Sequence, residues 1–583
     1  MAEAPPASPY SLVRSVVGPL ILALAWTLNS HAPSTFAIFE NTFLRALLFY
    51  AVVGLYLGRA DLLRLAGVPN RLHAVLLGGI LVLGAGLRFA EPSLPFHATN
   101  WMEDLVGRIA AEPEPDWYAN GFGMFMRMFV PFTPDAETAL FLGNRVAGTL
   151  APAALYAAAR AILGDSTRAL WAALLLAVLP LHLRLSASET MQIIPTLFIL
   201  VGVVGFRGHA RFRSRPLLVV GFSAFCFGVL TRPEWSVTAL ALPLAYCAPE
   251  DRAQLNDRWL WLGALFAAGI GIPLVGLGAT QHNVPLSSLK YAVSTFRDAL
   301  FQAGPPHGTW AALSGAGFLF AFVTAGRGRW VTLLPVVLLA AMITIAGFDK
   351  NPANELQLLC AESPWILLGT ACSMSALVQL AGRIRIQAAP AAAAGLAAVL
   401  GFQSFHATFF QVDWDKHEEF KFLKRVMPKI NALEPWLPMI RQDREDFTDG
   451  ELPSLPLYML RPHTRDFSMT SLLSGRVTPP VIYYRGVGCY HQLMAGGPKL
   501  KHPQPMTIVP PCSQVEAKFR MTPVEVTSFD ALPAWSKTVQ HFDIGFYRLD
   551  AKEPAQEAPP ENPGSPGGKP VDASAPGGAP PGR

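Results

Sequence analysis

Long apolar segments separated by short polar turns fill the first 410 residues of the chain. Most of these segments approach the roughly 20 apolar residues that a helix needs to cross a bilayer. Two of them, 217–231 and 235–248, are shorter, which leaves the number of spans open by one or two. The pattern predicts about thirteen transmembrane helices, near residues 10–28, 41–58, 72–90, 144–163, 169–187, 190–206, 217–231, 235–248, 259–279, 309–325, 330–347, 363–381 and 387–409.

Positive charges in the short turns predict the orientation of these helices. Arginines occur in five turns, and these turns fall on one side if the helices alternate: Arg59, Arg64 and Arg71; Arg160 and Arg168; Arg207, Arg211, Arg213 and Arg215; Arg327 and Arg329; Arg383 and Arg385. Since Lys and Arg are enriched in cytoplasmic loops, we assign this side, together with the N-terminus, to the cytoplasm. The long segment 91–143 and everything after residue 410 then lie outside the cytoplasm.

The alternation of spans and loops divides the chain into four parts. Residues 1–71 hold two N-terminal spans, and residues 72–410 form a membrane module with the long outward loop 91–143. In that loop MEDLVGRIAA and GFGMFMRMFV are predicted to be amphipathic helices on the membrane surface. The Pro- and Gly-rich end, 551–583, is expected to be disordered.

The segment 411–550 is predicted to form a small α/β domain outside the cytoplasm. WDKHEEFKFLKRVMPKI has the pattern of an amphipathic helix, and PVIYYRGVG and HFDIGFYRL have that of strands. Cys489 and Cys512 both belong to this segment, and an oxidising compartment favours a disulfide between them. Two free buried thiols are the alternative.

Composition supports a membrane protein over a soluble one. Of the 583 residues, 51% are hydrophobic and only 15% are charged, and the mean hydropathy is +0.33. Soluble domains carry about 25% charged residues, so the fold class is a mainly α, polytopic membrane bundle. The net charge of +5 is too small to indicate nucleic-acid binding. The abundance of Ala, Pro and Arg indicates a GC-rich bacterial source and hence the bacterial cytoplasmic membrane.

Three segments of the membrane module carry a further pattern. Residues 144–200 contain a helix led by Arg145, a turn with Gly164 and Arg168, an apolar helix ending in Pro180, and the cluster Arg184, Ser186 and Glu189. Before them, Arg88 ends a helix and is followed by the acidic pair Glu103-Asp104. After them, Thr231, Arg232 and Pro233 separate two apolar helices.

This pattern resembles the core of the GT-C glycosyltransferases, polytopic enzymes that take sugars from polyprenyl-phosphate carriers. The resemblance covers roughly residues 72–410 and is to the type that includes the protein O-mannosyltransferases and the aminoarabinose transferases. It implies a polyprenyl-phosphate-linked sugar as donor and an acceptor outside the cytoplasm, which is a lipid, a polysaccharide or a protein. Because the base, and hence the attacking acceptor hydroxyl, lies on the side of the sugar opposite the phosphate, the resemblance also implies inversion at the anomeric carbon.

The resemblance assigns roles to individual residues. Asp104 is the first candidate for the base that removes the acceptor proton, and Glu103 the second; an ordinary ion pair of Asp104 with Arg108 is the alternative. Arg232 and Arg184 are candidates for the donor phosphate, because the guanidinium fork binds phosphate oxygens. Supporting roles are assigned to Arg88, Glu189 and Lys290.

Other features of the sequence limit the alternatives. No Cys or His spacing indicates a metal site, so neither a metal nor another cofactor is expected, although a divalent cation stays open. A transporter or flippase for lipid-linked glycans is the second hypothesis, and a non-catalytic binding protein is the third. The chain shows no matching second half of the kind that transporters often contain.

Overall fold

The computed structural model describes most of the membrane module and the core of the C-terminal segment. The described residues are 33–67, 71–95, 99–110, 120–281, 293–294, 296–297, 299–300, 305–346, 352–385, 388–410, 414–433, 437–441, 455, 459–460, 465–490, 508, 510–531 and 540–552. The predicted first span at 10–28, Lys290 and most of the tail 551–583 lie outside them.

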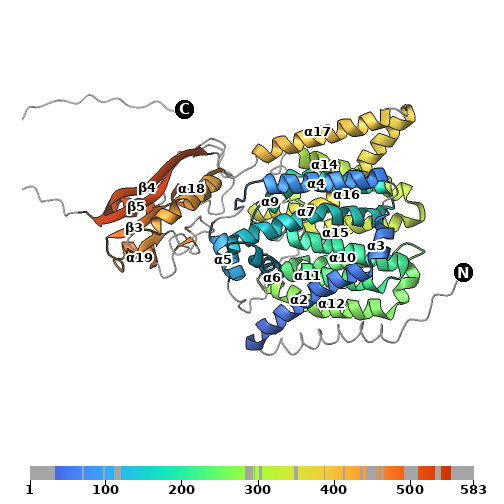
Figure 1. Ribbon diagram of the computed structural model, residues 1–583, viewed down its shortest axis with the longest axis horizontal. Helices are drawn as coiled ribbons and strands as arrows, with labels where there is room; N and C mark the ends of the chain where they lie inside the picture. Colours follow the sequence, from blue (N-terminus) through green and yellow to red (C-terminus); the bar gives the residue numbers. More distant parts are fainter. Residues whose placement is uncertain are drawn as a thin grey trace, which may run out of the picture.

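Helices fill the first of the two structural units, and they run side by side in a bundle (Figure 1). Their bounds are α2 Pro33–Leu57, α3 Arg59–Ala66, α4 Arg71–Ala90, α5 Thr99–Ala110, α6 Asn120–Arg127, η1 Val130–Phe132, α7 Ala136–Leu163, α8 Ser166–Val178, α9 Pro180–Ser186, α10 Ile193–Phe212, α11 Arg215–Thr231, η2 Pro233–Tyr246, η3 Arg252–Asn256, α12 Arg258–Gln281, α14 Pro305–Thr324, η5 Gly326–Leu333, α15 Leu334–Ala346, α16 Pro352–Ile384 and α17 Ala388–Phe410.

Helical segments occupy twelve of the thirteen predicted spans, and two of these differ from a straight α-helix. The span predicted at 169–187 is two helices, α8 and α9, which meet at Pro180 with a bend of 57°. A proline cannot donate a backbone hydrogen bond and clashes with the preceding turn, so the helix restarts there. The span predicted at 235–248 is the 3₁₀ helix η2.

Length and composition identify several of these helices as membrane-spanning. Within the described residues, four helices are long and apolar enough to cross a bilayer: Arg71–Ala90, Ala136–Leu163, Ile193–Phe212 and Gln357–Ile384. Two bent pairs raise this number to six if each pair is one span, and five further apolar helices are shorter. The protein is thus a mostly helical membrane protein with a small C-terminal sheet.

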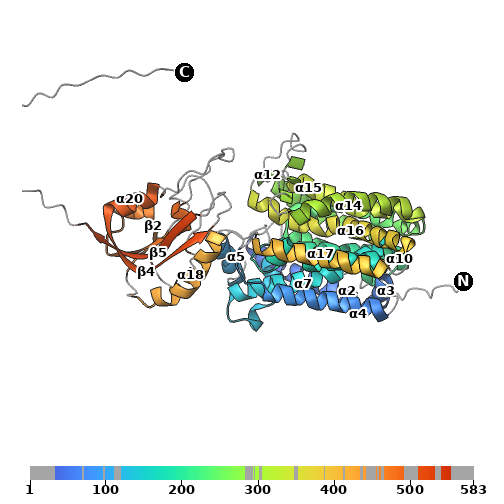
Figure 2. The ribbon, with the colours of Figure 1, turned by 90° about the horizontal axis from the view of Figure 1, so that it is seen from above.

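Most of the basic turns meet at one end of the bundle. Ser166 donates a hydrogen bond of 3.1 Å to the carbonyl of Gly67, which joins the first and second of these turns. The Arg168 guanidinium lies 5.5 Å from the ring centre of Phe320, near the fourth turn. A side chain on Gly58 would touch Leu217, near the third turn. The C-terminal unit lies at the opposite end (Figures 1 and 2).

The C-terminal unit is a five-stranded mixed sheet with helices around it. Its strand order is β2-β1-β3-β5-β4, in which β1 is parallel to β2 and β3, and β5 is antiparallel to β3 and β4. The bounds are α18 Trp414–Ile430, β1 Met439–Arg441, β2 Asp466–Ser468, α19 Met469–Leu473, β3 Val481–Arg485, η8 Val487–Tyr490, α20 Pro510–Lys518, β4 Phe519–Ala531 and β5 Gln540–Ala551. Cys489 and Cys512 form a disulfide in this unit.

Two hydrophobic cores correspond to the two units. The larger core fills the helical bundle. The smaller core lies between the sheet and α18, and it takes in one residue from the membrane module, Leu94. This leucine lies shortly after α4, which ends at Ala90, so the chain that leaves the bundle contributes to the packing of the C-terminal unit.

The two helices of the outward loop pack on the bundle. Met102, Leu105, Val106 and Ile109 of α5 are buried and belong to the larger core. Phe122, Met124, Phe125 and Met126 of α6 belong to it as well. The amphipathic faces expected from the sequence therefore cover the end of the bundle that faces the C-terminal unit (Figure 2).

Candidate active site

A continuous buried polar segment lies between α9 and α10. Every residue from Ser186 to Gln192 is buried, although five of these seven residues are polar. The segment follows the bend at Pro180, and its irregular backbone lies inside the bundle. Buried backbone groups need hydrogen-bond partners, and Asn144 of α7 supplies two of them: its Nδ2 donates to the carbonyls of Ser188 at 2.7 Å and Thr190 at 2.9 Å.

Close packing holds this polar segment against α7. A Cβ atom built on Gly148 would overlap the Ser186 side chain, so the glycine is what allows the two backbones to approach. Ser186 Oγ donates to the carbonyl of His182 at 2.5 Å. Glu189 is fully buried in the same segment. Its carboxylate therefore belongs to the buried polar segment and is shielded from solvent.

Arg88 of α4 donates hydrogen bonds to backbone carbonyls near the end of α8. It is fully buried, and its guanidinium donates to the carbonyls of Gly84, Leu176 and Ala177 at 2.8 to 3.1 Å. Its Nη2 also lies 2.8 Å from Nδ1 of His182. The last carbonyls of α8 have no partner within that helix. Arg88 thus connects α4 to the bend between α8 and α9, which is a structural kind of supporting role.

Arg184 binds the chain that leaves α4. Its two terminal nitrogens donate to the carbonyls of Leu94 at 3.0 Å and Pro95 at 2.9 Å. The described contacts of Arg184 therefore position the start of the outward loop. The predicted contact of Arg184 with a donor phosphate stays a prediction.

Glu91 lies next to this junction, one residue beyond α4. The Arg145 side chain donates to its carbonyl oxygen. Burial raises the pKa of the Glu91 carboxyl, while the nearby guanidiniums of Arg184 and Arg145 act in the opposite direction.

Arg232 is located where α11 ends. Its backbone N–H donates to the carbonyl of Gly228, and its side chain is 9% exposed. Helix α6 crosses this point closely, because a Cβ atom on Gly121 would come within 2.8 Å of Thr231 Oγ1 and 2.9 Å of Thr231 N. The outward loop therefore lies against the helix end that carries Arg232.

Glu103 and Asp104 lie on α5, and the structure describes their backbone but not their side chains. Helix α5 contacts α6 and α7, and α6 contacts α11. The fold thus brings the helix with the predicted acids to the same end of the bundle as Arg232 and the buried polar segment (Figure 1). Lys290 lies outside the described residues.

Two further buried polar side chains were not singled out from the sequence. Gln192 precedes α10, and within the described residues its amide has no hydrogen-bond partner. Glu362 of α16 is 1% exposed, and its Oε1 likewise has no partner there. An ionisable residue within a membrane helix is a functional candidate. The signal for Glu362 was its position inside the apolar run of 356–371.

Metal-ligating residues do not gather in the described part of the chain. No group of three or more His, Cys, Asp or Glu side chains is close enough there to hold a metal ion.

Comparison with known families gives one sequence match. Residues 121–276 match the family described as Dolichyl-phosphate-mannose-protein mannosyltransferase. The predicted GT-C resemblance is confirmed. The matched residues run from α6 to α12 and include Arg145, Arg184, Glu189 and Arg232, whereas Arg88, Glu103 and Asp104 precede them. The matched family is one of glycosyltransferases. No curated protein matches the chain.

Several solved structures have a related arrangement of helices. ArnT from Cupriavidus metallidurans bound to undecaprenyl phosphate is 14% identical, with a TM-score of 0.47, over 70% of this chain and 92% of that one. The oligosaccharyltransferase of Archaeoglobus fulgidus tethered with an acceptor peptide is 13% identical, with a TM-score of 0.40, over 63% and 58%. The same enzyme, AglB, with an inhibitory peptide and a dolichol-phosphate gives 13%, 0.41, 63% and 59%.

Proposed function

We propose that this protein is a membrane glycosyltransferase that moves a sugar from a polyprenyl-phosphate carrier to an acceptor outside the cytoplasm. The observation that carries the proposal is the family match over residues 121–276. The proposal includes about thirteen spans, a cytoplasmic N-terminus and an extracytoplasmic C-terminal unit, in the bacterial cytoplasmic membrane. The gathering of the basic turns at the end opposite the sheet supports this orientation.

The reaction follows from the chemistry of the donor. The acceptor hydroxyl oxygen forms a bond to the anomeric carbon, and the bond from that carbon to the phosphate oxygen breaks, so polyprenyl phosphate leaves with the electron pair. The proton of the hydroxyl passes to a carboxylate, for which Asp104 is the first candidate and Glu103 the second. A base placed in this way contributes roughly 10²–10⁴-fold. Because the sugar is already activated on its phosphate, the transfer as proposed uses no cofactor.

An apolar groove supports the placement of the donor lipid. A cavity of about 450 Å³ lies among α10, α11, η2, η3 and α12, and its lining is almost entirely apolar. Val229 and Ser236, which line it, flank Arg232 in the sequence. A lipid tail in this cavity would lead toward the helix end that carries Arg232.

Replacement of Asp104 tests the base. We expect Asp104→Asn to lower transfer from a radiolabelled polyprenyl-phosphate sugar by about 100-fold or more, because no other group would accept the proton as well. The measurement uses the full chain in nanodiscs, with a thermal unfolding midpoint to show that the variant is folded. Glu103→Gln is the matched neighbour. If Asp104→Asn turns over normally while Glu103→Gln is inactive, the base is Glu103.

Replacement of Arg232 tests the phosphate contact. We expect Arg232→Ala to weaken donor binding by about tenfold or more, since a charge-assisted hydrogen bond contributes about 1.5–3 kcal/mol. Arg211→Ala is the control, because Arg211 is exposed near the C-terminal end of α10, at the end of the bundle opposite to Arg232. Equal donor affinity in the two variants would remove Arg232 from the donor site. Movement of labelled donor across a vesicle membrane without a new glycosidic bond would favour a flippase.

A further inference from the structure

A basic cavity lies at the junction of the two structural units. It has a volume of about 740 Å³ and is formed by the chain that follows α4, the end of η1 and the turn after it, the first turns of α7 and one face of α18. The residues lining it are Ser93, Leu94, Phe132, Thr133, Pro134, Glu137, Thr138, Phe141, Leu142, Arg145, Phe420, Lys421, Lys424 and Arg425. None of the residues predicted to act in sugar transfer is among them.

Positive charge dominates the lining of this junction cavity. Four cations, Arg145, Lys421, Lys424 and Arg425, face one carboxylate, that of Glu137. Lys424 Nζ bonds Glu137 Oε2 at 2.8 Å, which neutralises one of the cations. Lys421 also bonds Glu418 at 2.7 Å, and the two side chains are 49% and 35% exposed. An ion pair that is partly open to solvent is weak, so Lys421 can still attract an anion in the cavity.

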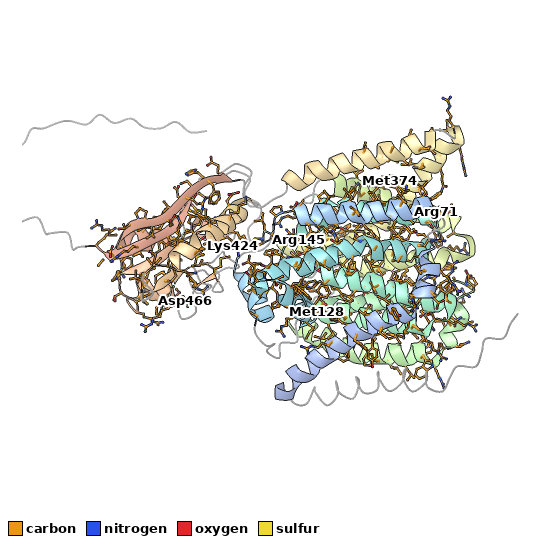
Figure 3. All side chains as sticks on the ribbon, viewed as in Figure 1. Arg71, Met128, Arg145, Met374, Lys424 and Asp466 are labelled. Atoms are coloured by element: carbon orange, nitrogen blue, oxygen red, sulfur yellow. A yellow bond between two sulfur atoms is a disulfide. The ribbon has the colours of Figure 1, made fainter. Side chains whose placement is uncertain are left out.

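The two arginines are the best-placed groups to bind an anion. Arg425 is exposed on α18, and within the described residues it has no carboxylate partner. Arg145 is half-buried on α7, and its Nε is a buried donor with no partner in the described part of the chain. Figure 3 places Arg145 and Lys424 on facing sides of the junction, so cations from both units border the same space. The guanidinium fork matches phosphate oxygens better than an ammonium group does.

The apolar residues that line the cavity, and its position in the fold, indicate the source of an anionic ligand. Phe132, Phe141, Leu142 and Phe420 give the cavity an apolar side next to its cations. The last helix of the bundle ends at Phe410, and α18 begins at Trp414, which puts the cavity at the level where the bundle leaves the membrane. Pockets of about 300–1,000 Å³ hold ligands larger than a single ion.

We propose that the junction cavity binds the phosphate group of an anionic, partly apolar ligand, with a membrane phospholipid headgroup as its source. The cations of α7 and α18 hold the phosphate, and the aromatic and aliphatic side chains contact the first carbons of the lipid. The bound lipid would then bridge the membrane module and the C-terminal unit. This inference is independent of the proposed sugar transfer.

Thermal stabilisation by added lipid tests this site in the full-length protein. In neutral detergent, we expect short-chain phosphatidylglycerol to raise the unfolding midpoint more than short-chain phosphatidylcholine does. We expect the double variant K421Q/R425Q to bind phosphatidylglycerol about tenfold more weakly and to lose this difference. The matched control is K429Q/K518Q, which also removes two exposed cations from the C-terminal unit but leaves the cavity intact.

Each outcome decides the proposal. Selective stabilisation that is lost in K421Q/R425Q and kept in K429Q/K518Q supports it. Equal responses of the two double variants would overturn it, as would equal effects of the two lipids on the unchanged protein. An inorganic phosphate arm separates the sources of the ligand: stabilisation by millimolar phosphate equal to that by phosphatidylglycerol would overturn the lipid source in favour of free phosphate. Because Arg145 is unchanged in both variants, its contact with Glu91 is preserved.

Discussion

At the scale of single residues, buried polar groups at the outward end of the bundle serve two different purposes. Arg88 and Arg184 bind backbone carbonyls and thereby fix the shape of the chain. Gln192 and Glu362 have side-chain atoms without partners among the described residues. Buried groups of the second kind cost stability, and proteins retain them mainly where a ligand or a reaction needs them.

The sequence could not distinguish these purposes. Arg184 and Arg232 have the same residue type and a similar position near a helix end, so a motif assigns both to phosphate. Only the fold shows that Arg184 reaches the carbonyls of Leu94 and Pro95, which lie about 90 positions earlier in the chain. Glu362 was missed because it belongs to no spacing motif; its only signal in the sequence is a single carboxylate inside an apolar run.

Glu91 gives a prediction about the pH dependence of stability. Burial raises the pKa of its carboxyl above the value of 4.5 that an unperturbed glutamate has, so the folded protein binds this proton more tightly than the unfolded chain does. Its contribution to stability is therefore present at low pH and is lost as pH rises from about 4.5 through the folded-state pKa. We expect Glu91→Gln to flatten this part of the stability profile.

Thermal unfolding midpoints between pH 4 and pH 8 measure the effect of Glu91→Gln. The difference between the variant and the unchanged protein should grow in favour of the variant as pH rises through that window. Glu418→Gln is a suitable control, because Glu418 also lies on the proposed extracytoplasmic side of the chain, on α18, and its side chain is 35% exposed. A pH profile that is the same with and without Glu91 would contradict the expectation.

At the scale of elements, apolar runs were predicted better than irregular segments and short strands. The length of an apolar run predicts a membrane helix because the thickness of the bilayer sets the number of apolar residues needed to cross it. Twelve of the predicted spans contain helical segments. The break at Pro180 shows the limit of run length alone: the predicted span 169–187 runs through the proline, although the family pattern ends a helix there. In the C-terminal segment, α18, β3 and β5 were predicted, whereas β1, β2 and β4 were not. Strand β4 contains Pro523 at an irregularity in its pairing, which hides its strand pattern.

The attachment of α18 to the sheet gives a prediction at this scale. Glu419 is 1% exposed, and its Oε1 accepts hydrogen bonds from Tyr484 Oη at 2.6 Å and Val487 N at 2.9 Å. Glu419→Ala would leave both donors buried without this acceptor, and each such loss costs about 1–3 kcal/mol. We expect a clear fall in the unfolding free energy of the C-terminal unit.

Hydrogen exchange of α18 and β3 measures this change within the full chain. The neighbouring substitution Glu418→Ala is the matched control, and it should change stability by no more than about 0.5 kcal/mol because its site is exposed. Equal protection of α18 in the two variants would show that Glu419 does not anchor the helix.

At the scale of the whole molecule, a few long-range contacts join the bundle to the C-terminal unit. Leu94 leaves the membrane module and packs in the smaller core beside α18. The ion pair of Glu137 with Lys424 joins residues 287 positions apart. No sequence pattern marks either contact, because each depends on how the two units meet. The outward loop, which contains the predicted acids, begins at this same junction.

The burial of Leu94 therefore predicts that the packing of this one side chain stabilises both the C-terminal unit and the start of the outward loop. Leu94→Ala removes apolar surface from the smaller core, and buried leucine-to-alanine changes cost about 2–5 kcal/mol. We expect faster hydrogen exchange both in α18 and in the residues after α4, together with slower sugar transfer, because the start of the outward loop loses its support. Leu72→Ala, at an exposed position of α4, is the control. If Leu94→Ala loosened only the C-terminal unit and left transfer unchanged, the loop would be held by its contacts with the bundle, including those of Arg184, and not by Leu94. Loss of protection on both sides of the junction would instead show that the sheet helps to position the candidate active site.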